Sequence, residues 1–174
     1  MATEVNTIYK LIILYMLNKI NFPMSNTQIS EFMLGKEYTN YFNLQQIISE
    51  LLEAEFLRIE SSNSRTTLYE ITPEGKDTLL YFSNKLSNSI KEDINSYLAA
   101  NKYEIKKEGS ISADFFKATS GDYIVHCVIR EGESTPIELN VACPSEEQAE
   151  IMCSKWRDAS QDIYQHIMDA LLLK

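Results

Sequence analysis

The sequence predicts an α+β fold, because two kinds of apolar spacing follow one another along its 174 residues. In the first half and near the end, apolar side chains recur three or four residues apart, which places them on one face of a helix. Between about residues 103 and 142 they alternate with polar side chains, as in half-buried strands. With 44% hydrophobic and 24% charged residues, the chain can bury the core of one domain or of two small ones.

Three helices are expected before the first strands, over about residues 5–19, 26–35 and 40–54. The break after the first helix falls at Phe22-Pro23, because proline cannot continue a helix. Either Ser25 or Asn26 can cap the second helix, since a short polar side chain accepts a bond from a free backbone N–H. The apolar stripe of the third helix consists of Leu44, Ile47, Ile48, Leu51 and Leu52.

A hairpin and a fourth helix follow. Strands are predicted over residues 56–60 and 66–71, joined by the polar turn at residues 61–64. Thr72 can then cap a helix that has Pro73 in its first position, where no N–H is needed. The apolar residues that follow fit either one long helix or two helices joined near Ser87-Asn88-Ser89. They are Leu79, Phe82, Leu86, Ile90, Ile94 and Tyr97.

The second half predicts an antiparallel meander and one more helix. Strands are expected over residues 103–107, 110–118, 123–130 and 137–142, with the first two separate or joined as one strand bulged at Gly109. Ser145 caps the last helix, whose stripe should cover one face of the sheet. The stripe consists of Ala149, Met152, Trp156, Ala159, Ile163, Ile167 and Ala170.

This order of elements predicts two domains. Residues 1–86 have the helix–helix–helix–hairpin order of a winged helix-turn-helix. Residues 87–174 should form an α-β-β-β-α domain for dimerisation or sensing. In it, a linking helix leads to an antiparallel sheet of three to four strands packed by a long C-terminal helix.

Both halves also resemble bacterial regulators. The first half contains the segment AEFLRIESSNSRTTLYEITPEGKDTL, which resembles the wing region of regulators of the MarR and PadR type. Tyr69 to Gly75 fits the YxLTxxG stretch that closes the wing in that family, with Ile71 in place of leucine. The segment SEEQAEIMCSKWRDASQDIYQHIM, with Trp156 and Tyr164, resembles the C-terminal part of an uncharacterised bacterial family assigned to transcription regulation. The resemblance implies a DNA-binding regulator of transcription.

A DNA-binding role needs a recognition helix whose N-terminal side chains reach base edges in the major groove. Asparagine and glutamine can pair bidentately with adenine, so the start of the third helix has suitable side chains. A lysine before this helix and an arginine in the turn of the hairpin are expected to contact phosphates or the minor groove. The candidate DNA-binding residues are Lys36, Thr39, Asn40, Tyr41, Asn43, Gln46 and Arg65.

The charge balance keeps a second interpretation open. The whole chain has a formal net charge of −9, and residues 1–86 hold 7 Lys and Arg against 10 Asp and Glu, a net charge of −3. Phosphate contacts by cations normally supply most of the affinity for DNA, so an acidic domain is at a disadvantage. The alternative is a winged helix that serves as a protein–protein interaction module without DNA binding.

A homodimer is expected in the first interpretation, because two half-sites add their contacts to DNA. The linking helix offers an apolar stripe for it, with Leu86, Ile90, Ile94 and Tyr97 as the dimerisation residues. The other interpretation of this stripe, that it only covers the protein's own core, is nearly as favourable.

An enzyme is not expected. His126 and Cys127 are neighbours in a predicted strand, so their side chains point to opposite faces and cannot form a dyad. Zinc binding by His126, Cys143 and Cys153 would need a coincidence of the fold, since buried cysteines usually act as small hydrophobes. The sequence shows no Gly-rich phosphate loop, nucleophile elbow or HExxH motif. We therefore expect no metal and no cofactor.

The remaining expectations concern location and ligands. Three cysteines without CxxC spacing and no signal peptide or membrane-spanning stretch favour a cytoplasmic protein with no membrane partner. The second domain could also bind an unknown small-molecule effector, or its aromatic side chains could simply be core. The aromatic residues available for a pocket are Tyr103, Phe115, Phe116, Tyr123 and Trp156.

Overall fold

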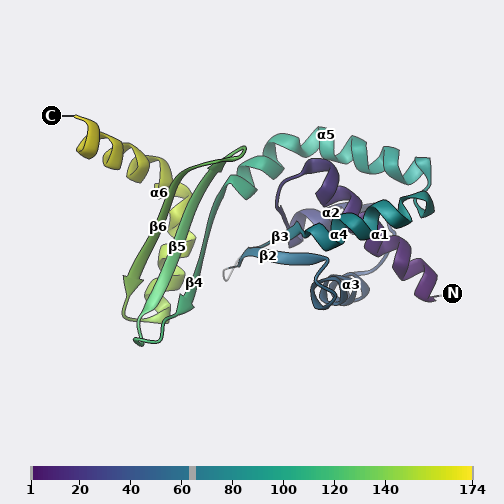
Figure 1. Ribbon diagram of the computed structural model, residues 1–174, viewed down its shortest axis with the longest axis horizontal. Helices are drawn as coiled ribbons and strands as arrows, with labels where there is room; N and C mark the ends of the chain where they lie inside the picture. Colours follow the sequence, from purple (N-terminus) through teal and green to yellow (C-terminus); the bar gives the residue numbers. More distant parts are fainter. Residues whose placement is uncertain (1, 63–65, 174) are drawn as a thin grey trace. The chain divides into compact units, whose positions relative to one another are not determined.

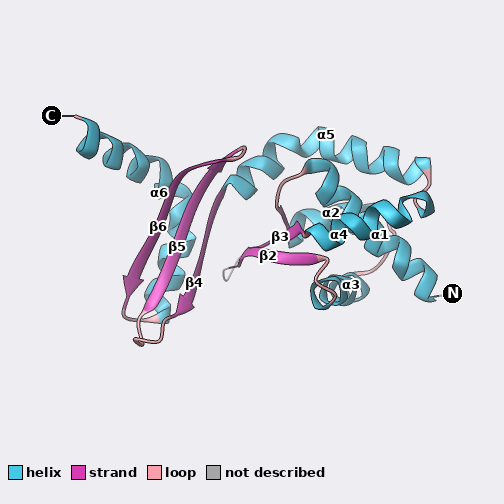
Figure 2. Cartoon of the chain, in the orientation of Figure 1, coloured by secondary structure: helices cyan, strands magenta, loops and turns pink. Residues whose placement is uncertain are grey.

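The computed structural model describes residues 2–62 and 66–173 of the chain. They form helices and two antiparallel sheets of three strands each (Figures 1 and 2). The chain divides into two compact units, one comprising Met1–Glu60 and Thr67–Lys106, the other Ser61–Thr66 and Lys107–Lys174. Within the described ranges, no helix combines the length and apolarity needed to cross a bilayer.

The first unit begins with three helices, α1 (Ala2–Ile20), α2 (Asn26–Gly35) and α3 (Tyr41–Glu53). They lie where the apolar periodicity predicts them. A capping box starts α2: the Ser25 hydroxyl accepts a bond from the backbone N–H of Gln28, and the Gln28 side chain accepts one from the Ser25 N–H. This local signal fixes where α2 begins.

A small sheet has the strand order β1-β3-β2 and contains the predicted hairpin. Its strands are β1 (Met24–Ser25), β2 (Leu57–Ser62) and β3 (Thr67–Ile71). Met24 in β1 lies opposite Tyr69 in β3. β1 was not predicted, because two residues are too few to show alternation.

The helices after the hairpin are two, not one. α4 (Pro73–Phe82) is followed by the 3-10 turn η1 (Ser83–Lys85), and α5 (Asn88–Ser110) begins after an extended Leu86. The strand predicted over residues 103–107 is wrong, because α5 continues through this segment. Ile105 is buried in the same core as Ile94 and Leu98, at helical spacing from both.

The core of the first unit joins α1, α2 and α3 to the hairpin and to α4 and α5. The predicted boundary at residue 86 coincides with the break between η1 and α5. The compact unit nevertheless reaches Lys106, because buried side chains of α5, including Ile94 and Leu98, belong to its core.

The second unit confirms the predicted antiparallel sheet followed by a long helix. β4 (Ile111–Lys117), β5 (Tyr123–Glu131) and β6 (Ser134–Cys143) form a three-stranded meander with β5 in the centre, and α6 (Glu146–Leu172) follows. Alternate residues of the strands share one apolar core with α6. The core residues include Ala113, Val125, Cys127, Ile129, Ala149, Cys153 and Trp156. The Trp156 indole N–H donates to the Val128 carbonyl oxygen at 3.2 Å.

Candidate nucleic-acid interface

The first turn of α3 is open to solvent. Asn40 caps it, with its side-chain oxygen 2.9 Å from the backbone nitrogen of Asn43. Tyr41 and Phe42 follow with exposed fractions of 53% and 85%, and their rings meet edge to face at 6.1 Å between centroids. Thus α3 presents a capped, positively polarised end and two exposed aromatic rings.

Asn43 is held against α1. Its side-chain amide donates to Asn6 Oδ1 at 3.1 Å and to Thr39 Oγ1 at 2.8 Å, and the residue is partly buried. Both donors of this amide are therefore engaged within the protein. To read a base, Asn43 would have to exchange these bonds for new ones.

Gln46 lies on the exposed side of α3. Its amide donates to Glu50 Oε1 at 3.2 Å, and Glu50 Oε2 lies 2.6 Å from Lys10 Nζ of α1. The bond from Lys10, followed by that from Gln46, lowers the pKa of the Glu50 carboxyl. The lysine is thus paired with an acid on the surface where cations would be needed.

The lysine before α3 is also paired. Lys36 Nζ lies 3.6 Å from Asp93 Oδ1 of α5, while the Tyr38 hydroxyl donates to the other oxygen of Asp93 at 3.1 Å. Burial, and then this bond to Asp93, raise the pKa of Tyr38. Arg65, the predicted contact in the turn of the hairpin, lies outside the described residues.

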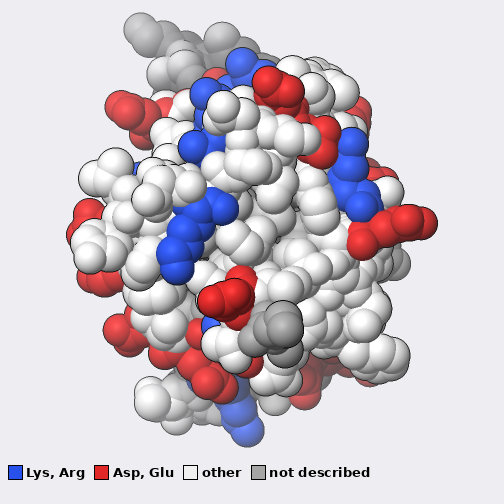
Figure 3. All heavy atoms as spheres, turned by 90° about the vertical axis from the view of Figure 1, so that its right-hand side faces the viewer, with Lys and Arg blue, Asp and Glu red and all other residues white. Residues whose placement is uncertain are grey.

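Charge is dispersed over the face seen in Figure 3. Lys and Arg side chains lie in small groups between acidic ones and a large uncharged area. In the described part of that face, we see no continuous basic surface. This distribution agrees with the acidic sign of the whole chain, −9 at pH 7.

A network of side-chain hydrogen bonds connects α2, α3 and β3, and the sequence did not reveal it. The amide of Asn26 donates to Gln45 Oε1 at 2.9 Å and to the Tyr69 hydroxyl at 3.2 Å. The amide of Gln45 returns a bond to Asn26 Oδ1 at 3.1 Å. The reciprocal pair fixes α3 relative to α2 and β3. Its only sequence signal is an amide residue on the inner side of each helix.

The predicted dimerisation residues lie mostly inside the first unit. Leu86 and Ile94 are 3% and 0% exposed, so they have almost no area to offer a second chain. Ile90 is half-buried against the same core. Tyr97 is also half-buried, and its hydroxyl donates to the backbone oxygen of Gln28 at 3.1 Å. For Leu86 and Ile94, burial in the protein's own core favours the other interpretation of this stripe, and a dimer contact through it stays a prediction.

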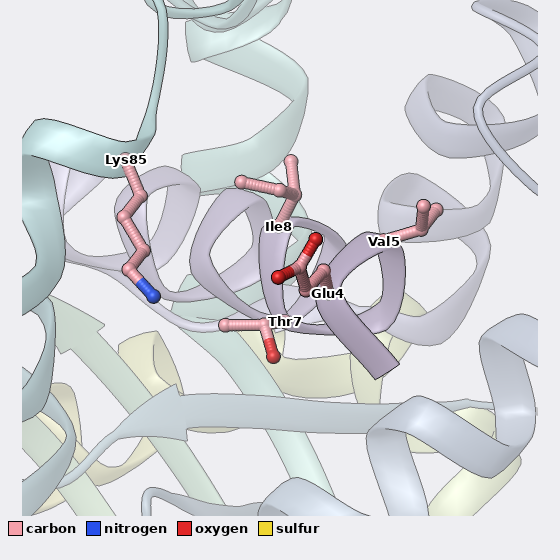
Figure 4. A pocket seen from close by; sticks show the side chains of 5 residues that line it. All are labelled: Glu4, Val5, Thr7, Ile8 and Lys85. Atoms are coloured by element: carbon pink, nitrogen blue, oxygen red, sulfur yellow. The ribbon is translucent and has the colours of Figure 1, made fainter. Parts of the chain in front are cut away.

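A groove lies beside α1, with a volume of about 420 Å³. It is lined by Glu4, Val5, Thr7 and Ile8 of α1 and by Lys85, whose side chain extends toward the helix (Figure 4). None of these residues is buried, so a small ligand here would stay largely in water. The groove therefore lacks the enclosure of an effector site.

The aromatic residues considered for an effector pocket are spread over the chain. Tyr103 is exposed on α5 and Phe116 is exposed on β4. Phe115 and Tyr123 contact each other edge to face, with 6.1 Å between ring centroids, and Trp156 of α6 is buried in the core of the second unit. Tyr103 and Phe116 are thus surface residues, whereas Phe115, Tyr123 and Trp156 belong to the core of the second unit or pack against it.

The second unit carries the residues considered for catalysis. His126 Nε2 lies 2.6 Å from Glu138 Oε1, and His126 Nδ1 lies 3.4 Å from Asp114 Oδ1. Burial raises the pKa of the Cys127 thiol to about 11 and that of Cys153 to about 12, so both are protonated at neutral pH. Across the described residues, His, Cys, Asp and Glu form no group of three that could hold a metal ion.

Comparison with known proteins gives one match. Residues 9–171 match the model of the family described as "Domain of unknown function (DUF4364)". No curated protein and no solved structure matches the chain. Because the matched region covers nearly the whole of the two units, the chain belongs to the DUF4364 family.

Proposed function

We propose that the chain is a cytoplasmic transcriptional regulator of the winged helix-turn-helix type, similar to MarR and PadR regulators, that binds double-stranded DNA as a homodimer. In this proposal α2 and α3 form the helix-turn-helix, α3 is the recognition helix, and the β2–β3 hairpin is the wing. The element order α1-β1-α2-α3-β2-β3 supports the assignment, because it places a hairpin directly after the third helix.

The observation that carries the proposal is the open first turn of α3. A recognition helix contacts DNA through its N-terminal residues, and this is the turn that Asn40 caps and that leaves Tyr41 and Phe42 exposed. The positive end of the helix dipole and the Tyr41 hydroxyl can both approach phosphate oxygens. Gln46, one turn further along the exposed side, can reach a base edge.

The paired lysines determine how such binding would behave. Lys36 and Lys10 would exchange Asp93 and Glu50 for phosphates, so each contact would replace an existing ion pair. Such an exchange contributes less to the affinity for DNA than a phosphate contact by an unpaired cation does. We therefore expect weak binding by one copy and a strong dependence on the pairing of two copies.

The experiment is a salt titration by fluorescence anisotropy of labelled genomic fragments. We expect saturable binding whose affinity falls linearly with salt on a double logarithmic scale. Replacing Lys36 by Gln should weaken binding to every fragment and reduce that slope by roughly 1. The matched control is Lys117→Gln at the exposed end of β4, which should bind like the wild type. Absence of binding at about 50 mM salt would reject the proposal.

The exposed aromatic pair favours a second candidate, a winged helix that binds protein rather than DNA. Tyr41 and Phe42 are exposed to a degree that is typical of residues that become buried on binding a protein partner. The acidic net charge of the chain supports this candidate as well. The titration separates the two, since a protein-binding module would leave DNA unbound at low salt.

A further inference from the structure

The turn between α2 and α3 carries two hydrogen-bond donors, the side chains of Lys36 and Tyr38. Glu37 between them has a φ of 57°, in the left-handed region. Its N–H donates to the Leu34 carbonyl oxygen at 3.0 Å, and the N–H of Tyr38 donates to that of Met33 at 3.1 Å. This is the Schellman arrangement that ends a helix. It fixes the backbone of the turn from which both donors extend.

Both donors meet one carboxylate, that of Asp93 on α5. The Tyr38 hydroxyl donates to Asp93 Oδ2 at 3.1 Å, and Lys36 Nζ lies 3.6 Å from Asp93 Oδ1. Each donor therefore faces a different oxygen of the same anion. A phosphate group, like a carboxylate, offers negatively charged oxygens that accept such charge-assisted bonds. The turn thus holds an anion supplied by the chain itself.

Packing of α5 against α2 keeps this carboxylate in place. Tyr97 lies four residues after Asp93, so both side chains extend from the same face of α5. The Tyr97 hydroxyl donates to the backbone oxygen of Gln28 in α2 at 3.1 Å. Phe32 of α2 contacts both the Tyr97 ring and the Tyr38 ring, at 5.2 and 5.9 Å between centroids. The contact of Asp93 with the turn therefore belongs to a packed arrangement.

We propose that Lys36 and Tyr38 form an oxyanion-binding site, which Asp93 occupies until a phosphate group of DNA displaces it. Asp93 is then an autoinhibitory residue, because it lowers the affinity of the turn for phosphate without contacting DNA itself. The inference rests on the proposed function, since it states what limits phosphate binding at that same surface. Tyr38 precedes Asn40, the cap of α3, by two residues, so the site adjoins the first turn of the recognition helix.

The ion pair is open enough to be exchanged. The side chains of Lys36 and Asp93 are 46% and 38% exposed. Water screens pairs of this exposure, and such a pair changes an equilibrium by about five-fold at most. A phosphate can therefore displace Asp93, and the carboxylate reduces the affinity for DNA without abolishing it.

Asp93→Asn tests the proposal, because the amide oxygen can still accept from the Tyr38 hydroxyl but has no charge to hold Lys36. We expect this variant to bind labelled DNA fragments about two- to five-fold more tightly than the wild type at the same salt concentration. The matched control is Glu92→Gln, which removes one acid from an exposed position about 100° around α5. Equal gains in the two variants would show an effect of net charge alone and would overturn the inference.

The double variant shows whether the gain depends on Lys36. In a Lys36→Gln background, Asp93→Asn should leave the affinity for DNA unchanged, because the cation that it releases is absent. A gain that persists in the double variant would contradict the inference. Weaker binding by Asp93→Asn with unchanged circular dichroism would also contradict it, because Asp93 would then position the turn for DNA instead of competing with DNA.

Acetylation of lysine amines measures the same contact without DNA. Peptide mapping should show faster acetylation of Lys36, relative to Lys117, in Asp93→Asn than in the wild type. Inorganic phosphate should then slow the acetylation of Lys36 in Asp93→Asn, because it occupies the vacated site. Unchanged acetylation of Lys36 in Asp93→Asn would overturn the inference.

The two measurements separate this inference from the proposed function. Faster acetylation together with tighter DNA binding that depends on Lys36 supports both. If Asp93→Asn exposes Lys36 and inorganic phosphate protects it, but no variant binds DNA at about 50 mM salt, the oxyanion site stands and the proposed function fails. If the wild type binds DNA and Asp93→Asn changes neither acetylation nor affinity, the proposed function stands and the inference fails.

Discussion

A Cβ atom on Gly75 would lie 2.2 Å from the backbone oxygen of Phe56. The same oxygen accepts a bond from the Thr72 N–H at 3.1 Å, and the Thr72 hydroxyl donates to the Glu55 carbonyl oxygen at 2.6 Å. Thr72 also caps α4 by accepting from the Gly75 N–H at 3.0 Å. The start of α4 is thereby held against the residues that join α3 to β2, and only glycine fits the contact.

Gly75→Ala should therefore destabilise the protein, by about 1–3 kcal/mol from overpacking against backbone that has little room to shift. Chemical denaturation followed by circular dichroism measures the change. Gly35→Ala at the end of α2 is the control, because nothing lies within 4 Å of its would-be Cβ atom. Equal midpoints for the two variants would show that the approach of Phe56 is not restrictive.

Asn43→Ala and Gln46→Ala should have different effects. Asn43 bonds to Asn6 and Thr39, so its loss should lower the free energy of unfolding by about 1 kcal/mol and weaken DNA binding indirectly. Gln46 is exposed and donates to Glu50, its half-buried neighbour on the same helix, so its replacement should leave stability within about 0.5 kcal/mol. Thermal melts and binding to a panel of fragments measure both effects. A loss of sequence preference confined to Gln46→Ala would identify the base-reading residue.

Stability should depend on the Glu50 carboxyl at low pH. Its pKa is lowered in the folded protein by Lys10, so its contribution is present above the ordinary value of 4.5 and is lost as the pH falls through the lower, folded pKa. Glu50→Gln removes this contribution. Thermal midpoints at pH 7 and near pH 3 should show a difference between wild type and variant that shrinks toward the acid side. The matched control is Glu53→Gln, also on α3 but exposed; a pH-independent difference for Glu50→Gln would contradict the expectation.

The cysteines should be inert while the protein is folded. The pKa values of Cys127 and Cys153 are raised to about 11 and about 12, mainly by burial, and neutral thiols react slowly. A thiol reagent at pH 8 should label them only after unfolding in urea. The two buried thiols also make stability depend on pH, because their folded pKa values lie above the ordinary 9.0. Their contribution to the free energy of unfolding is complete below pH 9 and is lost as the pH rises toward 11–12. Rapid labelling of either cysteine in the folded protein, located by peptide mapping, would disagree with its burial.

Local chemistry predicted the starts of three helices well. Ser25, Thr72 and Ser145 each accept a bond from the backbone of the first turn, as expected from side chains that satisfy free N–H groups, and Asn40 does the same at the start of α3. The antiparallel sheet over residues 111–143 followed from alternation between turns. These features depend on a few neighbouring residues, so a single sequence contains the information.

Features that depend on distant partners could not be predicted in this way. Tyr103 to Lys107 alternates like a strand, yet Ile105 is buried beside side chains that lie at least seven positions earlier, and α5 continues through the segment. The bond from Asn43 to Asn6 joins residues 37 positions apart. Periodicity identifies an exposed or buried face, but it does not tell which polar atom an amide meets there. The sequence therefore placed Asn43 and Gln46 on the third helix, where the structure has them, but it did not show their hydrogen bonds.

The bonded pair of Asn26 and Gln45 has a consequence for recognition. With Tyr69 it connects α2, α3 and β3 through polar bonds that have specific directions, unlike apolar contacts, which tolerate sliding. Helix and hairpin would thus reach a large ligand already in their final mutual orientation. Little conformational entropy would then be lost on complex formation, and selectivity would come from the ligand's shape having to match a preorganised surface.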